Sequence, residues 1–272
     1  MTAQLPHQSV PPRLTRHAAL RVWVAGAVPM LLLAACAGPT ASAQTSTPPA
    51  RNTQAGAAQP VAKQASGVQA TAAQPSCVLT PQQTEGPYFV DERLNRSDIR
   101  GNPADGAISE GVPLKLTINV SQVAGSSCTP LAGLFVDIWQ CDAHGVYSDV
   151  NDASRGSSVG NKFLRGYQVT DENGVVQFTT VYPGWYRGRA VHIHFKVRTA
   201  LDGGRQQVSQ FYFDDALTDE VHALAPYAAT GVRTTRNSQD GIFRNGGDQL
   251  TLQCTPDGEG YAATYHLGVQ LN

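Results

Sequence analysis

The sequence predicts an all-β protein: an antiparallel β-sandwich with one short helix, preceded by a signal segment and a disordered linker. Glycine and proline are plentiful, at 26 and 17 of 272 residues, and charged residues make up only 15% of the chain. This composition is typical of a turn-rich β protein rather than of a helical bundle. Short runs of alternating apolar and polar residues, divided by turn residues, indicate antiparallel strands packed as a sandwich.

The N-terminal 36 residues are typical of an export signal. Three arginines precede an apolar run of 14 residues at 22–35. Such a run is too short for a permanent membrane span but suits the hydrophobic region of a signal. It ends in Leu-Ala-Ala-Cys at 33–36, which resembles a bacterial lipobox. We therefore expect residues 1–36 to direct export and Cys36 to carry a lipid anchor.

An ordinary secretory signal is the alternative, because Ala41-Ser42-Ala43 fits a cleavage site made of small residues. Both interpretations predict an exported protein, either a membrane-anchored lipoprotein or a periplasmic or secreted one. The formal net charge is −1, so no basic field indicates nucleic acid as a partner.

A disordered linker is expected at 37–76. This segment is rich in Ala, Gln, Thr, Pro and Ser, and it contains no aromatic residue, no Leu and no Ile. Such a segment cannot bury enough apolar surface to offset its conformational entropy. The folded domain is then predicted at 77–272, a length suited to a single domain.

Four cysteines fall in the predicted folded domain, and an exported location permits disulfides. They are Cys77, Cys128, Cys141 and Cys254. Four cysteines allow three complete pairings, and sequence alone does not choose among them. No Cys-x-x-Cys pair occurs, so a zinc site built from thiolates is not expected.

Strands are predicted from alternation of apolar and polar residues. Apolar residues at 114, 116, 118 and 120 alternate with polar ones and indicate a half-buried strand. Tyr167 to Thr170 forms another, and Val176 with Phe178 follows Asn173-Gly174. Because Asn-Gly is a strong hairpin-turn signal, the strands on either side of it are predicted to form a hairpin.

The C-terminal third is predicted to hold two more strands and the helix. Apolar residues alternate at 250–254 and again at 263–271, which indicates a strand at each place. The helix is expected at Asp219 to Leu224, with Thr218 as its N-cap, because threonine oxygens accept hydrogen bonds from first-turn amides.

A candidate metal-binding pair lies in the segment 182–197. Apolar residues occupy one face of a predicted strand at 191, 193, 195 and 197, whereas His192 and His194 occupy the other. Two residues of strand rise separate their Cα atoms by about 6.5 Å, so both imidazoles can reach one ion. Imidazole suits first-row transition metals. A polar sheet face without a ligand role is the alternative.

Other metal sites that use His-x-His draw on an acidic ligand as well. The first acidic residue after His194 is Asp202 and the first glutamate is Glu220, so no local candidate is present. A remote carboxylate, Asp142 or Asp149, stays open as a third ligand.

Tyrosine and arginine surround the histidine pair instead. Tyr186 precedes it in a Pro-Gly-x-Tyr turn, and Arg189 stands three residues before His192. A second segment, at 131–148, is typical of an apolar strand that runs into a turn and presents Tyr147.

These segments resemble the signatures of the intradiol ring-cleavage dioxygenases, the family of the protocatechuate and catechol dioxygenases. Residues 131–148 contain Asp-x-Trp-Gln-Cys-Asp-Ala-x-Gly-x-Tyr, and 183–194 contain Tyr, Arg and His-x-His. Ser209 to Phe213 resembles the strand that follows in the family, and Thr84 to Phe89 resembles its opening segment. The resemblance covers about residues 77–271 and is strongest to the compact, exported branch.

The resemblance implies a metal site that holds one iron(III) ion per chain. The implied ligands are two tyrosinates and two histidines: Tyr147, Tyr186, His192 and His194. Tyr182 is the alternative to Tyr186, because the spacing from Tyr186 to His192 is shorter than in the best-known members. The Pro-Gly-x-Tyr match favours Tyr186.

The resemblance also implies catalytic residues and a reaction. Arg189, Gln210 and Tyr186 take the catalytic positions. The implied partners are a catechol-type small molecule and O₂, and the ring opens between its two hydroxylated carbons to a cis,cis-muconate-type product. Two alternatives stay open: a non-catalytic surface lipoprotein that binds aromatics or sugars, and another metalloenzyme that uses His-x-His.

Overall fold

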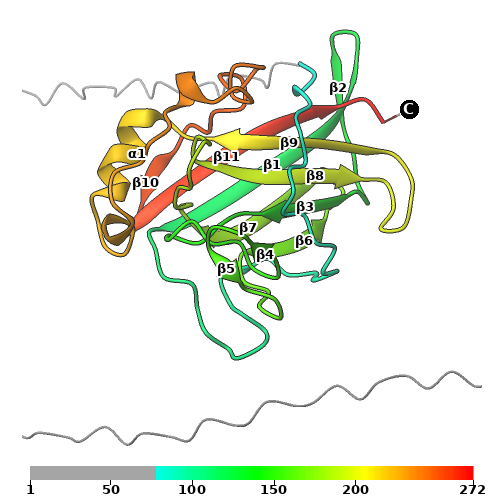
Figure 1. Cartoon of the computed structure of the whole chain (residues 1–272). Coiled ribbons are helices and arrows are strands. Elements are labelled where there is room, and N and C mark those ends of the chain that lie inside the picture. The colour runs from blue at the N-terminus through cyan, green and yellow to red at the C-terminus, as the bar shows by residue number, and fades with distance from the viewer. Residues whose placement is uncertain (1–77, 272) are drawn as a thin grey trace, which may run out of the picture. The chain divides into compact units, whose positions relative to one another are not determined.

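The structure, a computed structural model, describes residues 78–271. Figure 1 shows two layers of β-strands, with α1 beside one end of them. The predicted export signal at 1–36 and the predicted linker at 37–76 lie outside the described residues. Within the described part, no helix is long and apolar enough to cross a membrane.

Strands dominate the described part of the chain. The strands are β1 (Pro113–Ala124), β2 (Ser127–Pro130), β3 (Phe135–Trp139), β4 (Asn151–Asp152), β5 (Gly156–Ser157), β6 (Arg165–Val169), β7 (Val175–Val181), β8 (His192–Arg198), β9 (Gln206–Tyr212), β10 (Thr255–Asp257) and β11 (Gly260–Val269). The helical elements are α1 (Asp215–His222) and the 3-10 helices η1 (Tyr227–Thr230) and η2 (Asn237–Gln239).

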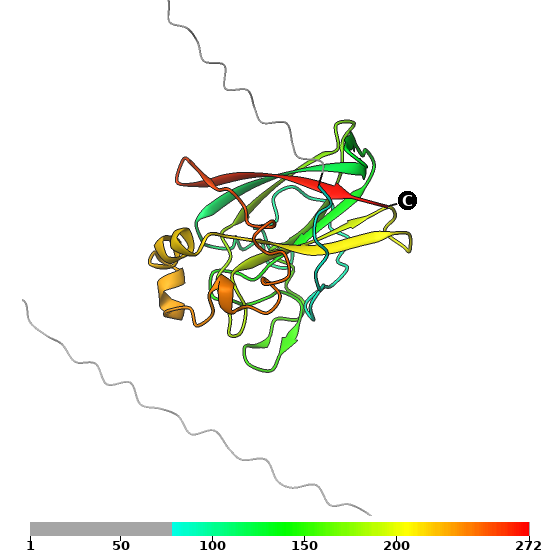
Figure 2. The same ribbon diagram turned by 90° about the horizontal axis from the view of Figure 1, so that it is seen from above.

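Two sheets form the sandwich, and β4 and β5 form a separate two-stranded ribbon. One sheet has the order β10-β11-β1-β2, with β7 also paired to β1, and the other has the order β6-β3-β8-β9. In Figure 2 the pairs β1–β11 and β8–β9 lie in separate layers. Every pair is antiparallel except β1 with β11. The predicted sandwich is therefore confirmed, with one parallel pair inside it.

The core between the sheets follows the predicted alternation. The alternating apolar residues of β1 from Leu114 to Val120 are at most 1% exposed, because they point toward the other sheet. They meet the alternate apolar residues of β3, β8 and β9 in one cluster, which includes Leu114, Leu116, Ile118, Val120, Val136, Ile138, Ile193, Phe195, Val197 and Phe211.

The opposite face of the β6-β3-β8-β9 sheet carries a second, smaller cluster. Ile138 of β3 joins the core between the sheets, whereas its neighbour Trp139 packs with Tyr147 in this second cluster. The same alternation along β8 turns His192 and His194 away from the core. The candidate site therefore lies on this outer sheet face, where β8 begins.

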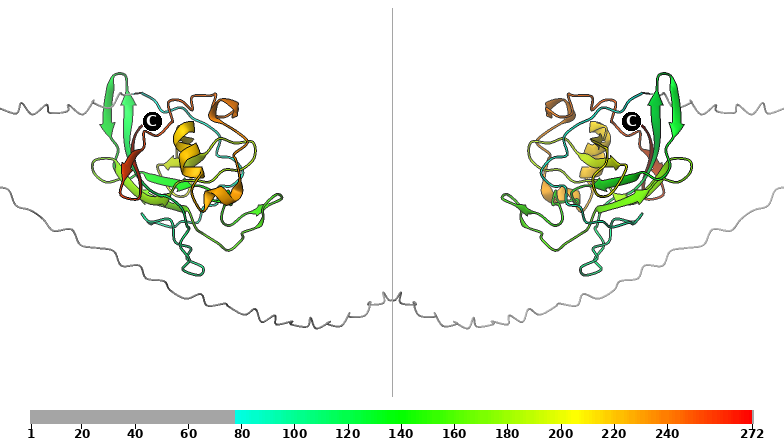
Figure 3. Two further views of the ribbon diagram at one scale, coloured as in Figure 1. Left: turned by 90° about the vertical axis from the view of Figure 1, so that its left-hand side faces the viewer. Right: turned by 90° about the vertical axis from the view of Figure 1, so that its right-hand side faces the viewer.

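The helix begins earlier than the sequence predicts, at Asp215 rather than at Asp219. Its N-cap is Asp214, whose carboxylate accepts hydrogen bonds from two first-turn amides at 2.8 and 3.0 Å. Thr218, the predicted N-cap, lies inside the helix, where its hydroxyl stands 2.8 Å from the hydroxyl of the buried Tyr182. Aspartate and threonine are both good N-cap residues. Here the Thr218 hydroxyl contacts Tyr182, and Asp214 is the N-cap. Figure 3 shows α1 at the end of the sandwich.

The predicted hairpin at Asn173-Gly174 is wrong. The dipeptide does form a turn, but β6 before it pairs with β3, and β7 after it pairs with β1 in the other sheet. The turn therefore carries the chain from one layer to the other. An Asn-Gly pair favours a local chain reversal, and it does not specify which strands pair on either side of it.

The predicted strand at 250–254 is also wrong. Only an isolated bridge between Thr251 and Tyr212 forms there. Leu250 is fully buried and Leu252 is 2% exposed, so both still belong to the core. The alternation correctly predicted which side chains are buried, but the backbone at 250–254 is irregular rather than a strand.

The cysteines do not form a complete set of pairs. Cys128 is disulfide-bonded, whereas Cys141 and Cys254 are free thiols. Cys141 is buried, and its Sγ lies 3.5 Å from the carbonyl oxygen of Gly184, next to the candidate site.

Candidate metal centre

The two histidines lie at the start of β8, in a row of outward-facing side chains. The register pairs His194 with Trp139 of β3 and with Gln210 of β9, and it pairs His192 with Tyr212. Directly paired residues share a sheet face, so these side chains are neighbours. The Trp139 ring stacks on His194 with 4.8 Å between centroids and 6° between planes. This stacking fixes the plane of the His194 imidazole.

The first tyrosine comes from the turn that follows β3. Asp142 organises this turn, because its carboxylate accepts hydrogen bonds from the amides of His144 and Val146, both at 2.9 Å. Gly145 has a φ of 80°, a conformation that glycine adopts without steric cost. The turn places Tyr147, only 3% exposed, beside the histidines.

The second tyrosine comes from the segment between β7 and β8. The Tyr186 ring centroid lies 5.7 Å from that of His192 and 5.7 Å from that of Tyr147. Tyr182 instead points toward α1, where its hydroxyl contacts Thr218 at 2.8 Å. The structure therefore brings Tyr186, and not Tyr182, to the histidine pair.

Four donor atoms converge in a buried cluster. His192 Nε2 lies 3.3 Å from the Tyr147 hydroxyl oxygen and 3.2 Å from the Tyr186 hydroxyl oxygen. It lies 3.0 Å from His194 Nε2. His192 and His194 are 2% and 1% exposed, so bulk water does not solvate these nitrogens. We call these four side chains the donor cluster.

Ala190 fixes the tautomer of His192. Its carbonyl can only accept a hydrogen bond, so His192 Nδ1, at 2.6 Å, carries the proton. The lone pair of Nε2 is then free to face the other three donors. Burial, aided by the Arg189 charge, lowers the pKa of His192 to about 3, and burial also holds the pKa of His194 well below its usual range. Both imidazoles are neutral near pH 7, which is the state that a metal ligand needs.

The two phenols fit a cation placed among these donors. Burial raises the pKa of Tyr147 and of Tyr186 above the usual range, so without a cation both phenols stay protonated. A metal ion at contact reverses this preference and favours the phenolates. Two nitrogens bonded at right angles to one ion, with bonds of about 2.1 Å, stand about 3.0 Å apart. His192 Nε2 and His194 Nε2 have this separation.

No carboxylate of the described residues lies with the histidine pair. Among residues 78–271, no group of three or more His, Cys, Asp or Glu side chains could share a metal ion. The Asp142 carboxylate serves its own turn, and the Asp149 carboxylate accepts from the Gly160 amide at 2.7 Å. The remaining donors beside the histidines are the two tyrosines.

Arg189 and Gln210 border the donor cluster. Arg189 Nη1 lies 3.5 Å from His192 Nε2, and its Nη2 donates to Gln210 Oε1 at 2.5 Å. Gln210 is fully buried, and its Nε2 donates to the Thr84 carbonyl at 2.9 Å. The structure therefore brings together all six residues that the sequence analysis singled out for the site.

The segment Thr84–Phe89 closes over one side of the cluster. A Cβ on Gly86 would stand 3.2 Å from His194 Cε1, so glycine permits this close approach. Lys196, on the same face of β8 as the histidines, forms an ion pair with Glu85 and lies 3.4 Å from the Phe89 ring centroid. These contacts hold the segment against the sheet.

Tyr88 is a site residue that the sequence analysis did not single out. Its ring stacks on Tyr147 with 4.6 Å between centroids, and its hydroxyl donates to Asp152 at 2.5 Å. Burial, together with this hydrogen bond, raises the pKa of Tyr88 to about 12. Its position within the Thr84–Phe89 segment was the only sequence signal for it. Asp240, which contacts Arg189 from 51 residues away, had no such signal.

The fold and the donor cluster define a class: β-sandwich proteins with a buried set of imidazole and phenol groups. The sequence model of the family described as Dioxygenase matches residues 84–241 of this chain, more than half of its length. The structure of an intradiol ring-cleavage dioxygenase from Tetranychus urticae is similar, with 32% identity and a TM-score of 0.63 over 71% of this chain and 95% of that one. The chain belongs to the intradiol ring-cleavage dioxygenase family.

Two further relatives have a lower sequence identity to this chain. A dioxygenase domain from a Streptomyces fusion protein has 26% identity and a TM-score of 0.51, over 72% of this chain and all of that one. The chlorocatechol 1,2-dioxygenase of Pseudomonas putida is 29% identical over 179 residues, 58% of this chain. The chain spans 62% of that relative's length, which is less than two thirds.

Proposed function

We propose that this protein is an oxidoreductase that uses iron(III) to cleave a catechol-type ring between its two hydroxylated carbons. Both atoms of O₂ enter the product, which is a cis,cis-muconate-type acid. The observation that carries this proposal is the donor cluster, in which two phenols and two neutral imidazoles meet without a carboxylate. Family membership supports it, as does a relative named for chlorocatechol.

One iron(III) ion per chain would be held by Tyr147, Tyr186, His192 and His194. Anionic phenolate oxygens favour iron(III) over iron(II), because they offset the higher charge. When bound, the ion would supply Lewis-acid chemistry to the catechol oxygens and so favour reaction of the ring with O₂. The tautomer that Ala190 imposes keeps the His192 lone pair ready for this role.

The two tyrosines differ in exposure, which supports different roles for them. Tyr147 is 3% exposed and is covered by the Tyr88 ring, so it is the fixed donor. Tyr186 is only partly buried, so it would be the donor that a substrate can approach. Its phenolate would be a base for a catechol proton, because burial raises the pKa of Tyr186 when no cation stabilises the phenolate.

Arg189 and Gln210 act on the substrate side of the cluster. The permanent charge of Arg189 lies 3.5 Å from His192 Nε2, where it can stabilise negative charge that develops on the ring. Gln210 holds the Arg189 guanidinium through its Oε1 and is itself held by the Thr84 carbonyl. Because Gln210 is fully buried, it maintains this geometry without competition from water.

The proposal is tested by metal content, colour and oxygen uptake in the same preparation. The purified protein should contain about one iron per chain and absorb broadly in the visible, because phenolate-to-iron(III) charge transfer is red-brown. It should consume O₂ with at least one member of a catechol panel while muconate absorbance rises in parallel. Tyr147→Phe should bleach much of the visible band.

Three outcomes would count against the proposal. Stoichiometric zinc with no visible band would remove the iron assignment. A colourless protein that binds catechols without oxygen uptake would favour the binding-module alternative. Iron(II) or copper with no tyrosinate band would favour a different His-x-His metalloenzyme.

A further inference from the structure

The Arg189 guanidinium is held by hydrogen bonds at two of its nitrogens. Its Nη2 donates to Gln210 Oε1, and its Nε donates to Asp240 Oδ2 at 2.9 Å. Its Nη1 lies 3.5 Å from His192 Nε2. A planar guanidinium fixed at Nε and at Nη2 has little freedom to rotate. The two contacts therefore decide which edge Arg189 presents to the donor cluster.

Asp240 is suited to this task because it is itself fixed. Its side chain is 1% exposed, and its Oδ1 accepts from the Ile242 amide at 2.7 Å. Its Oδ2 accepts from the Ala190 amide at 2.9 Å as well as from Arg189. Burial alone would raise the pKa of Asp240, but the Ala190 hydrogen bond and the Arg189 charge outweigh it and lower that pKa. The carboxylate is therefore an anion at neutral pH.

The same carboxylate also reaches His192 indirectly. The Ala190 amide donates a hydrogen bond to Asp240. The Ala190 carbonyl accepts a hydrogen bond from His192 Nδ1 at 2.6 Å. One anion thus fixes both the arginine beside the cluster and the residue that sets the histidine tautomer.

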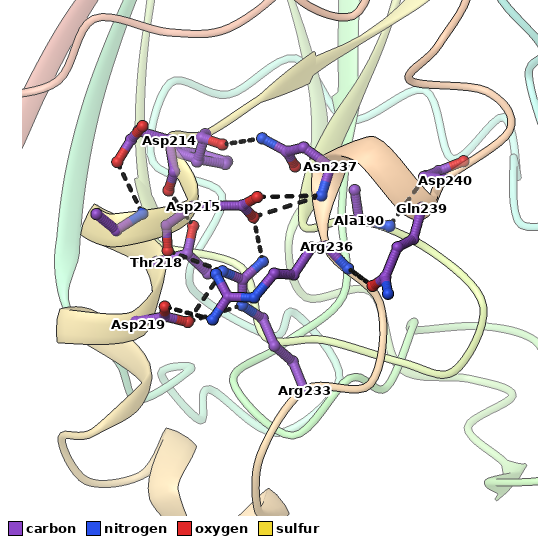
Figure 4. A network of polar contacts seen from close by, with 12 residues as sticks. Ala190, Asp214, Asp215, Thr218, Asp219, Arg233, Arg236, Asn237, Gln239 and Asp240 are labelled. Carbon is purple, nitrogen blue, oxygen red and sulfur yellow. Dashed lines mark hydrogen bonds and ion pairs between the residues drawn. The ribbon is translucent and has the colours of Figure 1, made fainter.

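The segment that carries Asp240 is anchored to α1, as Figure 4 shows. Asn237 donates its amide to the Asp215 carboxylate at 3.4 Å and its side-chain Nδ2 to the Phe213 carbonyl at 2.8 Å. Arg233 binds the same Asp215 carboxylate at 2.5 Å. The backbone amide of Asp240 then donates to the Asn237 carbonyl at 3.2 Å. These hydrogen bonds hold the segment of Asp240 against α1, at the end of the sandwich.

We propose that Asp240 is a positioning residue of the site: its contact with Nε fixes the orientation in which the Arg189 guanidinium faces the donor cluster. This role rests on the proposed function for its effect on turnover, but the contact between Asp240 and Arg189 can be tested without that function. Asp240 contacts the Arg189 side chain directly, so the effect of its loss on turnover should depend on Arg189.

The kinetic test is a double-mutant cycle in the full chain. Asp240→Ala should lower kcat by about 10–100-fold, as loss of an outer-shell partner does. KM should change little. The kcat of Asp240→Asn should lie between those of the wild type and Asp240→Ala. In the Arg189→Ala background, Asp240→Ala should lower kcat by less than about twofold, because coupled residues are not additive. Asp248→Asn, an exposed carboxylate in the same segment, is the matched control and should behave as wild type.

The second test uses metal-free, ¹⁵N-labelled protein and requires no activity. The Arg189 Nε–H signal, assigned by its absence from Arg189→Ala, should be shifted downfield and protected from exchange in the wild type. Asp240→Ala should abolish both properties, and Asp248→Asn should retain them. If Asp240→Ala does not fold, the wild-type spectrum still decides, with the exposed Arg187 as the internal reference.

Two results would overturn the role of Asp240. One is an Arg189 Nε–H that exchanges as fast as that of Arg187. The other is an equal drop in kcat from Asp240→Ala in the wild-type and Arg189→Ala backgrounds. A protected Arg189 signal without oxygen uptake would instead support the contact between Asp240 and Arg189 and refute the proposed function.

Discussion

Arg187 and Arg189 lie two positions apart in one turn and differ in their surroundings. Arg187 is exposed, whereas the Arg189 side chain is 16% exposed and contacts Asp240, Gln210 and His192. A permanent charge held this close to the donor cluster acts on any charge that develops there, because the site excludes most water. At the scale of a residue, position and not chemical type separates the two arginines.

Arg189→Ala should retain its iron and its colour but turn over about 10²–10³ times more slowly, the usual cost of losing one charge-stabilising donor. The loss should appear mainly in kcat, since the charge that Arg189 stabilises is greatest in the transition state. Steady-state oxygen uptake with a catechol measures this effect. Arg187→Ala is the control and should keep near-normal rates. If Arg189→Ala loses its iron or turns over normally, its catalytic role is wrong.

At the scale of elements, the two tyrosine-bearing turns are packed together through glycine. The Gly184 amide donates to the Asp142 carbonyl at 3.0 Å, which ties the turn of Tyr186 to the turn of Tyr147. A Cβ on Gly184 would stand 2.5 Å from the carbonyl oxygens of Asp142 and Ala143. Both neighbours are backbone atoms, so neither can move without displacing its turn.

Gly184→Ala should therefore push the two tyrosines apart. We expect a loss of about 1–3 kcal/mol in the free energy of unfolding, as overpacking usually costs, together with a weaker visible band and less bound iron. Thermal unfolding and metal analysis measure these changes. Gly101→Ala is the control, because a Cβ there meets Ile108 at an ordinary 3.6 Å. A Gly184→Ala protein with normal stability and full iron would show that the turns are independent.

At the scale of the whole molecule, the predicted linker at 37–76 should be dispensable. It has no aromatic residue, no Leu and no Ile with which to join a core. A chain that starts near Ser76 should therefore match the full chain in melting temperature and in oxygen uptake. A large fall in melting temperature would show that this segment is a structural arm.

We also propose that the chain is exported and that Cys36 carries a lipid. Cys36→Ser should move the protein from the membrane fraction to the soluble fraction, because serine at this position would not carry the lipid that anchors the chain. Fractionation followed by mass measurement of the N-terminus tests this proposal. A wild-type protein that is fully soluble and begins at Gln44 would establish the ordinary signal instead.

Local sequence determined two of the strands, β1 and β8, and the histidine pair on β8. The alternation at 114–120 and along 191–197 follows from the two-residue period of a strand, which depends only on neighbouring residues. That period also turned His192 and His194 to one face. The tyrosines were reached through motif resemblance, and their role as metal ligands stays a prediction.

Only the tertiary structure decided which distant residues meet. Strand pairing set His194 between Trp139 and Gln210, and chain packing brought Asp240 to Arg189 across 51 residues. It also turned Asn173-Gly174 into a crossing between sheets. The physical reason is that periods and turn residues express preferences of adjacent backbone, whereas strand partners and buried ion pairs depend on the packing of the whole chain.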